Sequence, residues 1–115
     1  MTPSKQKPLS EAAIHKAVVS HWRHFGLPNT LVATVPNMGS MGQYGLTKGL
    51  PDLLILAPSL PVGFIELKSE TGRVSEAQLH FQTHCERLHI PFAITRGRDE
   101  PIKLLELWGV VRGQT

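Results

Sequence analysis

The 115-residue sequence predicts a small mixed α/β fold in which helices flank a central hairpin. One supporting observation is the stretch at residues 51–68, where two apolar runs are joined by a short turn. Continuous apolar runs of this kind are typical of strands buried in the centre of a sheet. The other is the order of strand, amphipathic helix and strand from Ile65 to Thr95, which predicts a crossover between parallel strands.

Composition indicates a globular protein, because hydrophobic residues make up 41% of the chain and charged residues 18%. At this length we expect one domain at residues 10–115, preceded by a flexible tail at residues 1–9. The lone Cys85 has no partner for an internal disulfide and suits a reducing compartment. No apolar run approaches the length of a membrane span, so we expect a cytoplasmic protein of a bacterial or phage-infected cell, with no membrane partner.

The residues before the hairpin predict a helix, a strand and a loop. Ser10 is a suitable N-cap for a helix that ends near residue 25. The apolar stripe of this helix consists of Ile14, Val18, Trp22 and Phe25. The β-branched run at residues 31–35 predicts a strand. Residues 36–49 contain four glycines and no apolar periodicity, which predicts a long loop beside the hairpin.

The hairpin is predicted at residues 52–57 and 62–68, and a second helix is expected from Ser75 to about Leu88. The buried stripe of that helix is predicted to be Phe81, Cys85 and Leu88. Residues 91–95 predict the last strand, and Asp99 is the expected cap of a final helix. The final helix is predicted to pack through Ile102, Leu105 and Trp108, and the chain from residue 109 onward to fray.

Three charged residues stand at the ends of the hairpin strands. Side chains alternate along a strand, so Glu66 and Lys68 face the same side, and hairpin pairing brings Asp52 near Glu66. Charged groups in an apolar sheet are rarely buried unless they pair or bind metal. Two carboxylates can hold Mg²⁺, and a lysine beside the metal can orient an attacking water. The alternative is a structural ion pair on an exposed strand, which imitates a site.

Three segments of the sequence together resemble the VRR-NUC family of the PD-(D/E)xK nuclease superfamily. They are KGLPDLLIL at residues 48–56, FIELK at 64–68 and TGRVSEAQ at 71–78. The resemblance extends over most of the chain, from about Glu11 to Arg96. It implies a restriction-endonuclease-like αβββαβ core with a small mixed sheet flanked by helices. It also implies a nuclease that depends on Mg²⁺ or Mn²⁺.

The resemblance also implies roles for individual residues. Asp52 and Glu66 match the acidic positions that hold metal, with the Leu67 carbonyl as a further ligand, and Lys68 matches the lysine that positions water. Glu11 lies early in the first helix, where the family places a glutamate near the metal, so the resemblance implies that Glu11 is a further metal ligand and that it and Gln78 complete the shell around metal and water. In that position a carboxylate also favours the helix macrodipole, which is a sufficient structural reason for it.

Other residues extend the expected site or compete with it. The resemblance implies that the Gln78 side chain faces the active site, but Ser75 and Gln78 also fit a capping box. His80 and His84 have a spacing that can chelate zinc, although no second ligand pair is evident, and solvated helix faces explain them better.

The expected DNA contacts are Asn37, Lys48, Arg73 and Arg96. For the loop residues among them, a flexible surface loop is the competing interpretation. The chain has 12 Lys and Arg and 9 Asp and Glu. Setting aside Glu11, Asp52, Glu66 and Lys68 leaves 11 bases and 6 acids. A surface that leans basic favours a polyanionic partner.

The leading functional hypothesis is a metal-dependent DNA endonuclease, structure-specific for junction, flap or branched DNA. Cutting both strands of a junction needs two active sites, so a homodimer is a further hypothesis. The alternative is a catalytically silent DNA-binding or scaffold module with the nuclease fold. A phosphohydrolase of small nucleotides is disfavoured, because the glycines and Lys48 do not have P-loop spacing.

Overall fold

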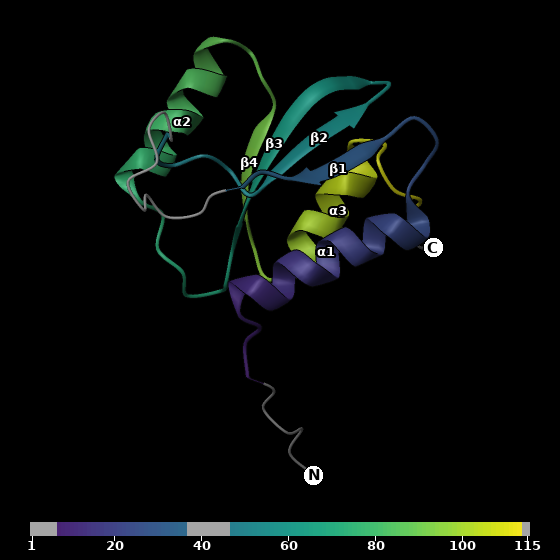
Figure 1. The fold of residues 1–115 in the computed structure, drawn as a ribbon, viewed down its shortest axis with the longest axis horizontal. Coiled ribbons are helices and arrows are strands. Elements are labelled where there is room, and N and C mark those ends of the chain that lie inside the picture. The colour runs from purple at the N-terminus through teal and green to yellow at the C-terminus, as the bar shows by residue number, and fades with distance from the viewer. Residues whose placement is uncertain (1–6, 37–46, 114–115) are drawn as a thin grey trace.

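The computed structural model describes residues 7–36 and 47–113. Residues 1–6 of the predicted tail and the predicted DNA contact Asn37 lie outside the described residues. The elements follow one another as helix, three strands, helix, strand and helix, as predicted (Figure 1). They are α1 Glu11–Phe25, β1 Leu31–Thr34, β2 Leu53–Ala57, β3 Leu60–Lys68, α2 Glu76–Arg87, β4 Phe92–Arg96 and α3 Asp99–Leu107. The predicted mixed α/β class is confirmed.

The four strands form one mixed sheet in the order β1-β2-β3-β4. β1 and β2 are antiparallel, as are β2 and β3, whereas β3 and β4 are parallel. The central position of β2 and β3 confirms that the apolar hairpin is the middle of the sheet. Since β2 begins where β1, β3 and β4 end, four strand termini meet at one end of the sheet, which we call the site end.

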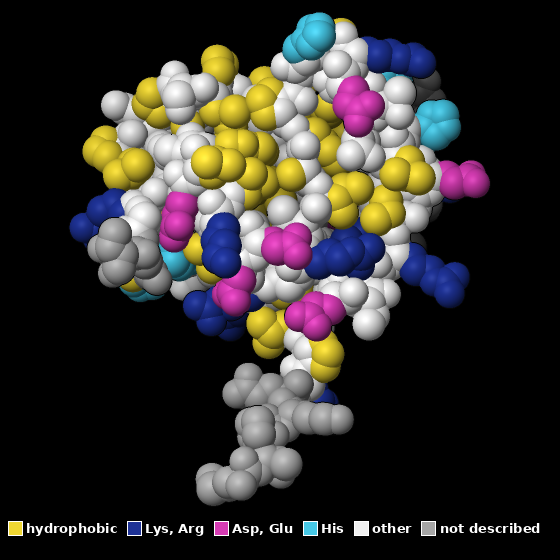
Figure 2. Space-filling view, turned by 180° about the vertical axis from the view of Figure 1, so that it is seen from behind, with side chains coloured by type: hydrophobic (Ala, Val, Ile, Leu, Met, Phe, Trp, Pro, Cys, Tyr) yellow, Lys and Arg dark blue, Asp and Glu magenta, His cyan; other side chains and the backbone are white. Residues whose placement is uncertain are grey.

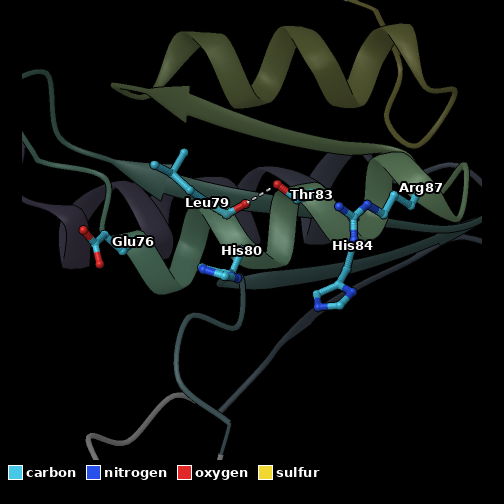
Figure 3. Close-up of a pocket in the computed structure, with 6 residues that line it drawn as sticks. All are labelled: Glu76, Leu79, His80, Thr83, His84 and Arg87. Atoms are coloured by element: carbon cyan, nitrogen blue, oxygen red, sulfur yellow. Dashed lines mark hydrogen bonds between the residues drawn. The ribbon is translucent and has the colours of Figure 1, made fainter.

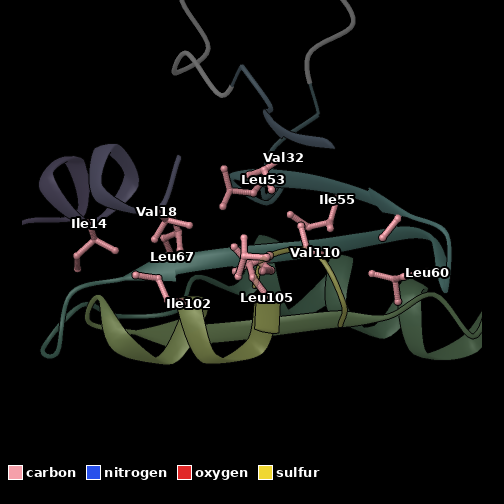
Figure 4. Packing of buried hydrophobic residues seen from close by; sticks show 13 residues of the cluster. Ile14, Val18, Val32, Leu53, Ile55, Leu60, Leu67, Ile102, Leu105 and Val110 are labelled. Carbon is pink, nitrogen blue, oxygen red and sulfur yellow. The ribbon is translucent and has the colours of Figure 1, made fainter. Parts of the chain in front are cut away.

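The two faces of the sheet are covered by different helices. On one face, buried side chains of α1, α3 and the strands form a continuous apolar core, part of which is shown in Figure 4. The core members labelled there are Ile14, Val18, Val32, Leu53, Ile55, Leu60, Leu67, Ile102, Leu105 and Val110. On the other face, Phe81 of α2 packs edge-on against Phe64 and at a tilt against Phe92. Because side chains alternate along a strand, Glu66 and Lys68, two and four residues after Phe64, share its face.

Local capping defines where the first two helices begin. The Ser10 side chain accepts a hydrogen bond of 3.1 Å from the backbone N–H of Ala13, as its sequence position predicts.

Asp99 was expected to cap α3, and this expectation is wrong. Asp99 is already helical, and the N-cap residue is Arg98, which makes no side-chain capping bond. In the first turn, Glu100 accepts a hydrogen bond of 3.1 Å from the backbone N–H of Arg96, and both acidic side chains, Asp99 and Glu100, also favour the helix macrodipole.

The segment after α3 is ordered, which contradicts the expectation that it frays. Val110 and Val111 are buried in the core, and Leu27 donates a backbone hydrogen bond of 2.9 Å to the Val110 carbonyl. Arg112 donates a bond of the same length to the carbonyl of Phe25, so the segment is tied to the end of α1. The expectation that Leu88 belongs to the buried stripe of the second helix is also wrong. Leu88 is the C-cap residue of α2 and is 67% exposed.

None of the helices in the two described stretches is both long and apolar enough to cross a membrane.

Candidate active site

Asp52 and Glu66 lie side by side at the site end of the sheet. The register pairs Leu53 with Ile65, which places the preceding Asp52 beside the following Glu66. Oδ2 of Asp52 accepts a hydrogen bond of 2.7 Å from the backbone N–H of Leu67. The Asp52 carbonyl accepts another of 2.9 Å from Val35, so the residue is held between β1 and β3. The proximity that hairpin pairing predicts is therefore observed.

Glu66 is the most unusual ionisable group of the described chain. Its side chain is 2% exposed, and Oε2 is buried with no hydrogen-bond partner. Burial, followed by the hydrogen bond and charge of Asp52, raises the pKa of Glu66 to about 9 from an ordinary value of 4.5. The charge of Lys68 opposes this rise, and that of Glu11 adds to it. Glu66 thus tends to keep a proton at neutral pH unless a cation offsets its charge.

Lys68 supplies a buried positive charge on the same strand. It is 6% exposed, and its Nζ lies 3.9 Å from Oε1 of Glu11, which is half exposed in the first turn of α1. Glu11 therefore reaches the strand that carries the other candidate residues. The structure brings together Glu11, Asp52, Glu66 and Lys68, the four charged residues of the predicted catalytic set.

The turn between β3 and α2 is fixed by Arg96 at the end of β4. Nη1 of Arg96 lies 2.7 Å from the Gly72 carbonyl, 3.2 Å from that of Ser69 and 3.4 Å from that of Glu70. The turn then passes close to the ion pair. A Cβ added to Gly72 would stand 3.2 Å from Oε2 of Glu11 and 3.4 Å from Cδ of Lys68. The turn therefore packs against the side chains of Glu11 and Lys68, and Arg96 holds the turn in place.

Gln78 makes the capping box that its spacing predicts. Its Oε1 accepts a hydrogen bond of 2.9 Å from the Ser75 N–H, and its own N–H donates one of 3.1 Å to the Ser75 hydroxyl. The capping box therefore uses Oε1 of the Gln78 side chain. The catalytic role that the family resemblance implies for Gln78 stays a prediction.

The predicted DNA contacts occupy different environments. Lys48 and Arg73 are exposed on the segments that lead into β2 and into α2. Gly49, next to Lys48, has a φ of +84°, and a Cβ there would stand 2.3 Å from the backbone of Ala77. This close approach holds the lead-in segment against the first turn of α2. Arg96 instead points one guanidinium nitrogen at backbone carbonyls, and its contact with DNA stays a prediction.

The donor set suits a hard divalent cation. Glu66 presents a buried oxygen without a partner, beside a second carboxylate whose backbone is fixed on both sides. Mg²⁺ is typically bound by one or two carboxylates and completes its shell with water and substrate phosphate. Within residues 7–36 and 47–113 no three His, Cys, Asp or Glu side chains are arranged to hold a metal. Asp52 and Glu66 thus fit a partly hydrated magnesium and not a cage built wholly from protein.

A hollow of about 510 Å³ lies along α2 and is lined by neither Asp52 nor Glu66 (Figure 3). Its lining residues are Glu76, Leu79, His80, Thr83, His84 and Arg87. The Thr83 hydroxyl donates a hydrogen bond of 3.0 Å to the Leu79 carbonyl. His80 and His84 have no third His, Cys, Asp or Glu ligand in the described chain, so the histidine pair does not complete a zinc site.

The fold and this charged cluster define a mixed α/β domain with an acidic, lysine-containing site at the ends of its central strands. The family model of the VRR-NUC domain matches residues 9–99. The chain therefore belongs to the VRR-NUC domain family and contains a nuclease-family domain, which confirms the resemblance drawn from its sequence.

Solved structures agree with this assignment. One described as "VRR_NUC domain protein" has a TM-score of 0.74 at 18% identity and covers 89% of each chain. Another, described as "VRR_NUC domain", has a TM-score of 0.60 at 20% identity and covers 85% of this chain and 97% of its own. At these identities the similarity establishes a shared fold. None of the curated proteins matches this chain.

Proposed function

We propose that this protein is a metal-dependent DNA endonuclease that hydrolyses phosphodiester bonds in junction, flap or otherwise branched DNA. The observation that carries the proposal is the partnerless, buried oxygen of Glu66 beside Asp52, with the buried Lys68 on the same strand. A domain that only binds DNA has no evident need for a buried carboxylate at this position, because burying it opposes its ionisation.

Each side chain has a defined task in this proposal. Asp52 and Glu66, with the Leu67 carbonyl, hold Mg²⁺ or Mn²⁺. When bound, such an ion lowers the pKa of a coordinated water and offsets charge on the scissile phosphate. Lys68 donates a hydrogen bond that orients the attacking water. Glu11 lies 3.9 Å from the Lys68 ammonium and positions it beside the carboxylates.

Cleavage of labelled single-stranded, duplex, flap and four-way-junction DNA tests the proposal. Each substrate is incubated with Mg²⁺, Mn²⁺ or EDTA, using wild type, Lys68→Met and the matched control Lys103→Met. Lys103 is exposed on α3, so its replacement removes the same charge away from the site. We expect cleavage that depends on metal, that persists in the control and that falls at least about 100-fold in Lys68→Met.

DNA binding without cleavage under either metal would instead support a catalytically silent binding module. Glu66→Gln separates the two functions further, because a binding module should keep its DNA affinity and have no cleavage to lose. Molecular mass measured by light scattering at the assay concentration tests the homodimer, which would supply the second active site needed to cut both strands of a junction.

A further inference from the structure

A groove runs between the solvent side of α1 and the end of the edge strand β1. It has a volume of about 410 Å³, and its polar lining includes His15, Lys16, Arg23, His24 and Thr34. The His15 ring connects α1 to β1, because its Nε2 lies 2.9 Å from the Thr34 hydroxyl, within hydrogen-bond distance. The groove is therefore formed by side chains from two elements of the fold and not by one helix alone.

The charge of this groove differs from that of the hollow along α2 and from that of the hollow beside the β4–α3 turn. Lys16 and Arg23 line it, and no Asp or Glu does. The hollow on α2 includes Glu76, and the hollow beside the β4–α3 turn includes Glu70 and Asp99. Figure 2 shows a similar mixture on one face of the molecule, where Lys and Arg side chains alternate with Asp and Glu in a band. A groove whose Lys and Arg side chains are not balanced by any Asp or Glu complements a polyanion.

One end of the groove lies next to the candidate active site. His15 lies one helical turn after Glu11, whose carboxylate faces Lys68. On the other wall, Thr34 pairs with Leu53, the residue after Asp52, and Val35 donates its N–H to the Asp52 carbonyl. One end of the groove thus opens at the site end of the sheet. The other end extends along α1 toward His24.

The spacing of the cations fits a nucleic acid strand. Lys16 and Arg23 are seven residues apart, which is about 10 Å along the axis of α1. Successive phosphates of one strand of duplex DNA advance by about 3.4 Å along its axis. The two cations can therefore contact phosphates about three nucleotides apart. When Nε2 of His15 accepts the Thr34 hydroxyl, its Nδ1 can donate a hydrogen bond to a phosphate oxygen, whereas Nδ1 of His24 already donates to the Ser20 carbonyl.

We infer that the α1–β1 groove binds the sugar–phosphate backbone of the DNA strand that leads to or from the scissile phosphate. This inference rests on the proposed nuclease function and adds a contact surface that the loop residues Lys48 and Arg73 do not supply. The contacts are to phosphates, so the groove sets the register and path of the strand and reads no base sequence.

The test compares the double variant Lys16→Gln/Arg23→Gln with the charge-matched control Lys103→Gln/Arg87→Gln. Both control residues are exposed and lie outside the groove. Affinity for a labelled flap and for a duplex is measured in EDTA between 50 and 300 mM salt, and cleavage is measured with Mg²⁺. Thermal unfolding establishes that both variants are folded.

Loss of two phosphate contacts should lower the slope of log K against log salt by about 1.4 to 1.8. At about 150 mM salt this slope corresponds to roughly 15- to 30-fold weaker binding. KM for cleavage should rise by a similar factor with little change in kcat, and the control should stay close to wild type. This pattern would support the groove as a DNA track.

Equal weakening of the groove variant and the control would overturn the inference, because general charge would then explain the binding. Unchanged affinity and salt slope in the groove variant would overturn it as well. If wild type never cleaves but the groove variant still binds DNA selectively more weakly, the nuclease proposal fails and the groove stands. If wild type does not bind DNA at all, both fail.

Discussion

Replacing Glu66 by glutamine isolates the energetic cost of a buried carboxylate at the centre of the site. The side chain is 2% exposed, and burial and Asp52 raise the pKa of Glu66 to about 9 from 4.5. A carboxyl group whose pKa rises on folding binds its proton more tightly in the folded state. It stabilises the fold fully below pH 4.5, and this stabilisation is lost progressively as the pH rises toward 9.

The magnitude follows from proton linkage. Between these two pKa values the folded protein holds one more proton than the unfolded chain. The free energy of unfolding therefore falls by about 1.4 kcal/mol per pH unit through this group. From pH 6 to pH 8 the metal-free wild type should lose about 2.7 kcal/mol that Glu66→Gln does not lose. Titrations common to both proteins cancel in the comparison.

Urea unfolding in EDTA at pH 6, 7 and 8 measures this difference, with Glu86→Gln on the exposed side of α2 as the control. The control should follow the wild-type pH dependence. A wild-type minus Glu66→Gln difference that does not change with pH would refute the burial argument. Adding 10 mM Mg²⁺ at pH 8 should stabilise wild type by mass action and leave Glu66→Gln almost unaffected.

Three further predictions concern residues that support the site. Arg96→Lys should weaken the three carbonyl contacts, speed amide exchange in the β3–α2 turn and reduce cleavage about tenfold while leaving DNA affinity in EDTA unchanged. A selective loss of affinity would make Arg96 a DNA contact instead. Gly49→Ala should lower the free energy of unfolding by about 1–3 kcal/mol in urea, because its φ is +84° and its Cβ would meet Ala77; unchanged stability would contradict this. Gln78→Ala should cost about 1 kcal/mol as a lost cap, whereas a large loss of cleavage at unchanged stability would assign it to the chemistry.

The sequence predicts the order of the elements and the pairing of the central carboxylates because both depend on short-range patterns. Apolar periodicity locates α1 and the hairpin, and pairing within a hairpin brings Asp52 to Glu66 without reference to the rest of the chain. The capping boundaries at Ser10 and Ser75 are likewise local, since each cap binds a backbone group three residues away.

What the sequence does not predict depends on contacts between distant segments. The guanidinium of Arg96 bonds to carbonyls 24 to 27 residues earlier, and no local pattern distinguishes it from an arginine free to contact DNA. Val110 lies just beyond α3, yet it is buried, because the end of α1 and Leu27 after it hold this segment by backbone hydrogen bonds. The α1–β1 groove arises in the same way, from the contact of His15 with Thr34 across 19 residues.

These contacts explain how a small protein can hold an unfavourable charge cluster. Glu66 and Lys68 end the central strand β3 and pair there with β4, so their backbone positions are fixed by the sheet. Gly97 adds a hydrogen bond of 2.9 Å to the Lys68 carbonyl, and Arg96 secures the turn that follows. The main freedom left to Glu66 is therefore protonation, since its burial prevents hydration. A divalent cation would relieve this cost by replacing the proton, which is why the stability of this protein should report metal binding without any substrate present.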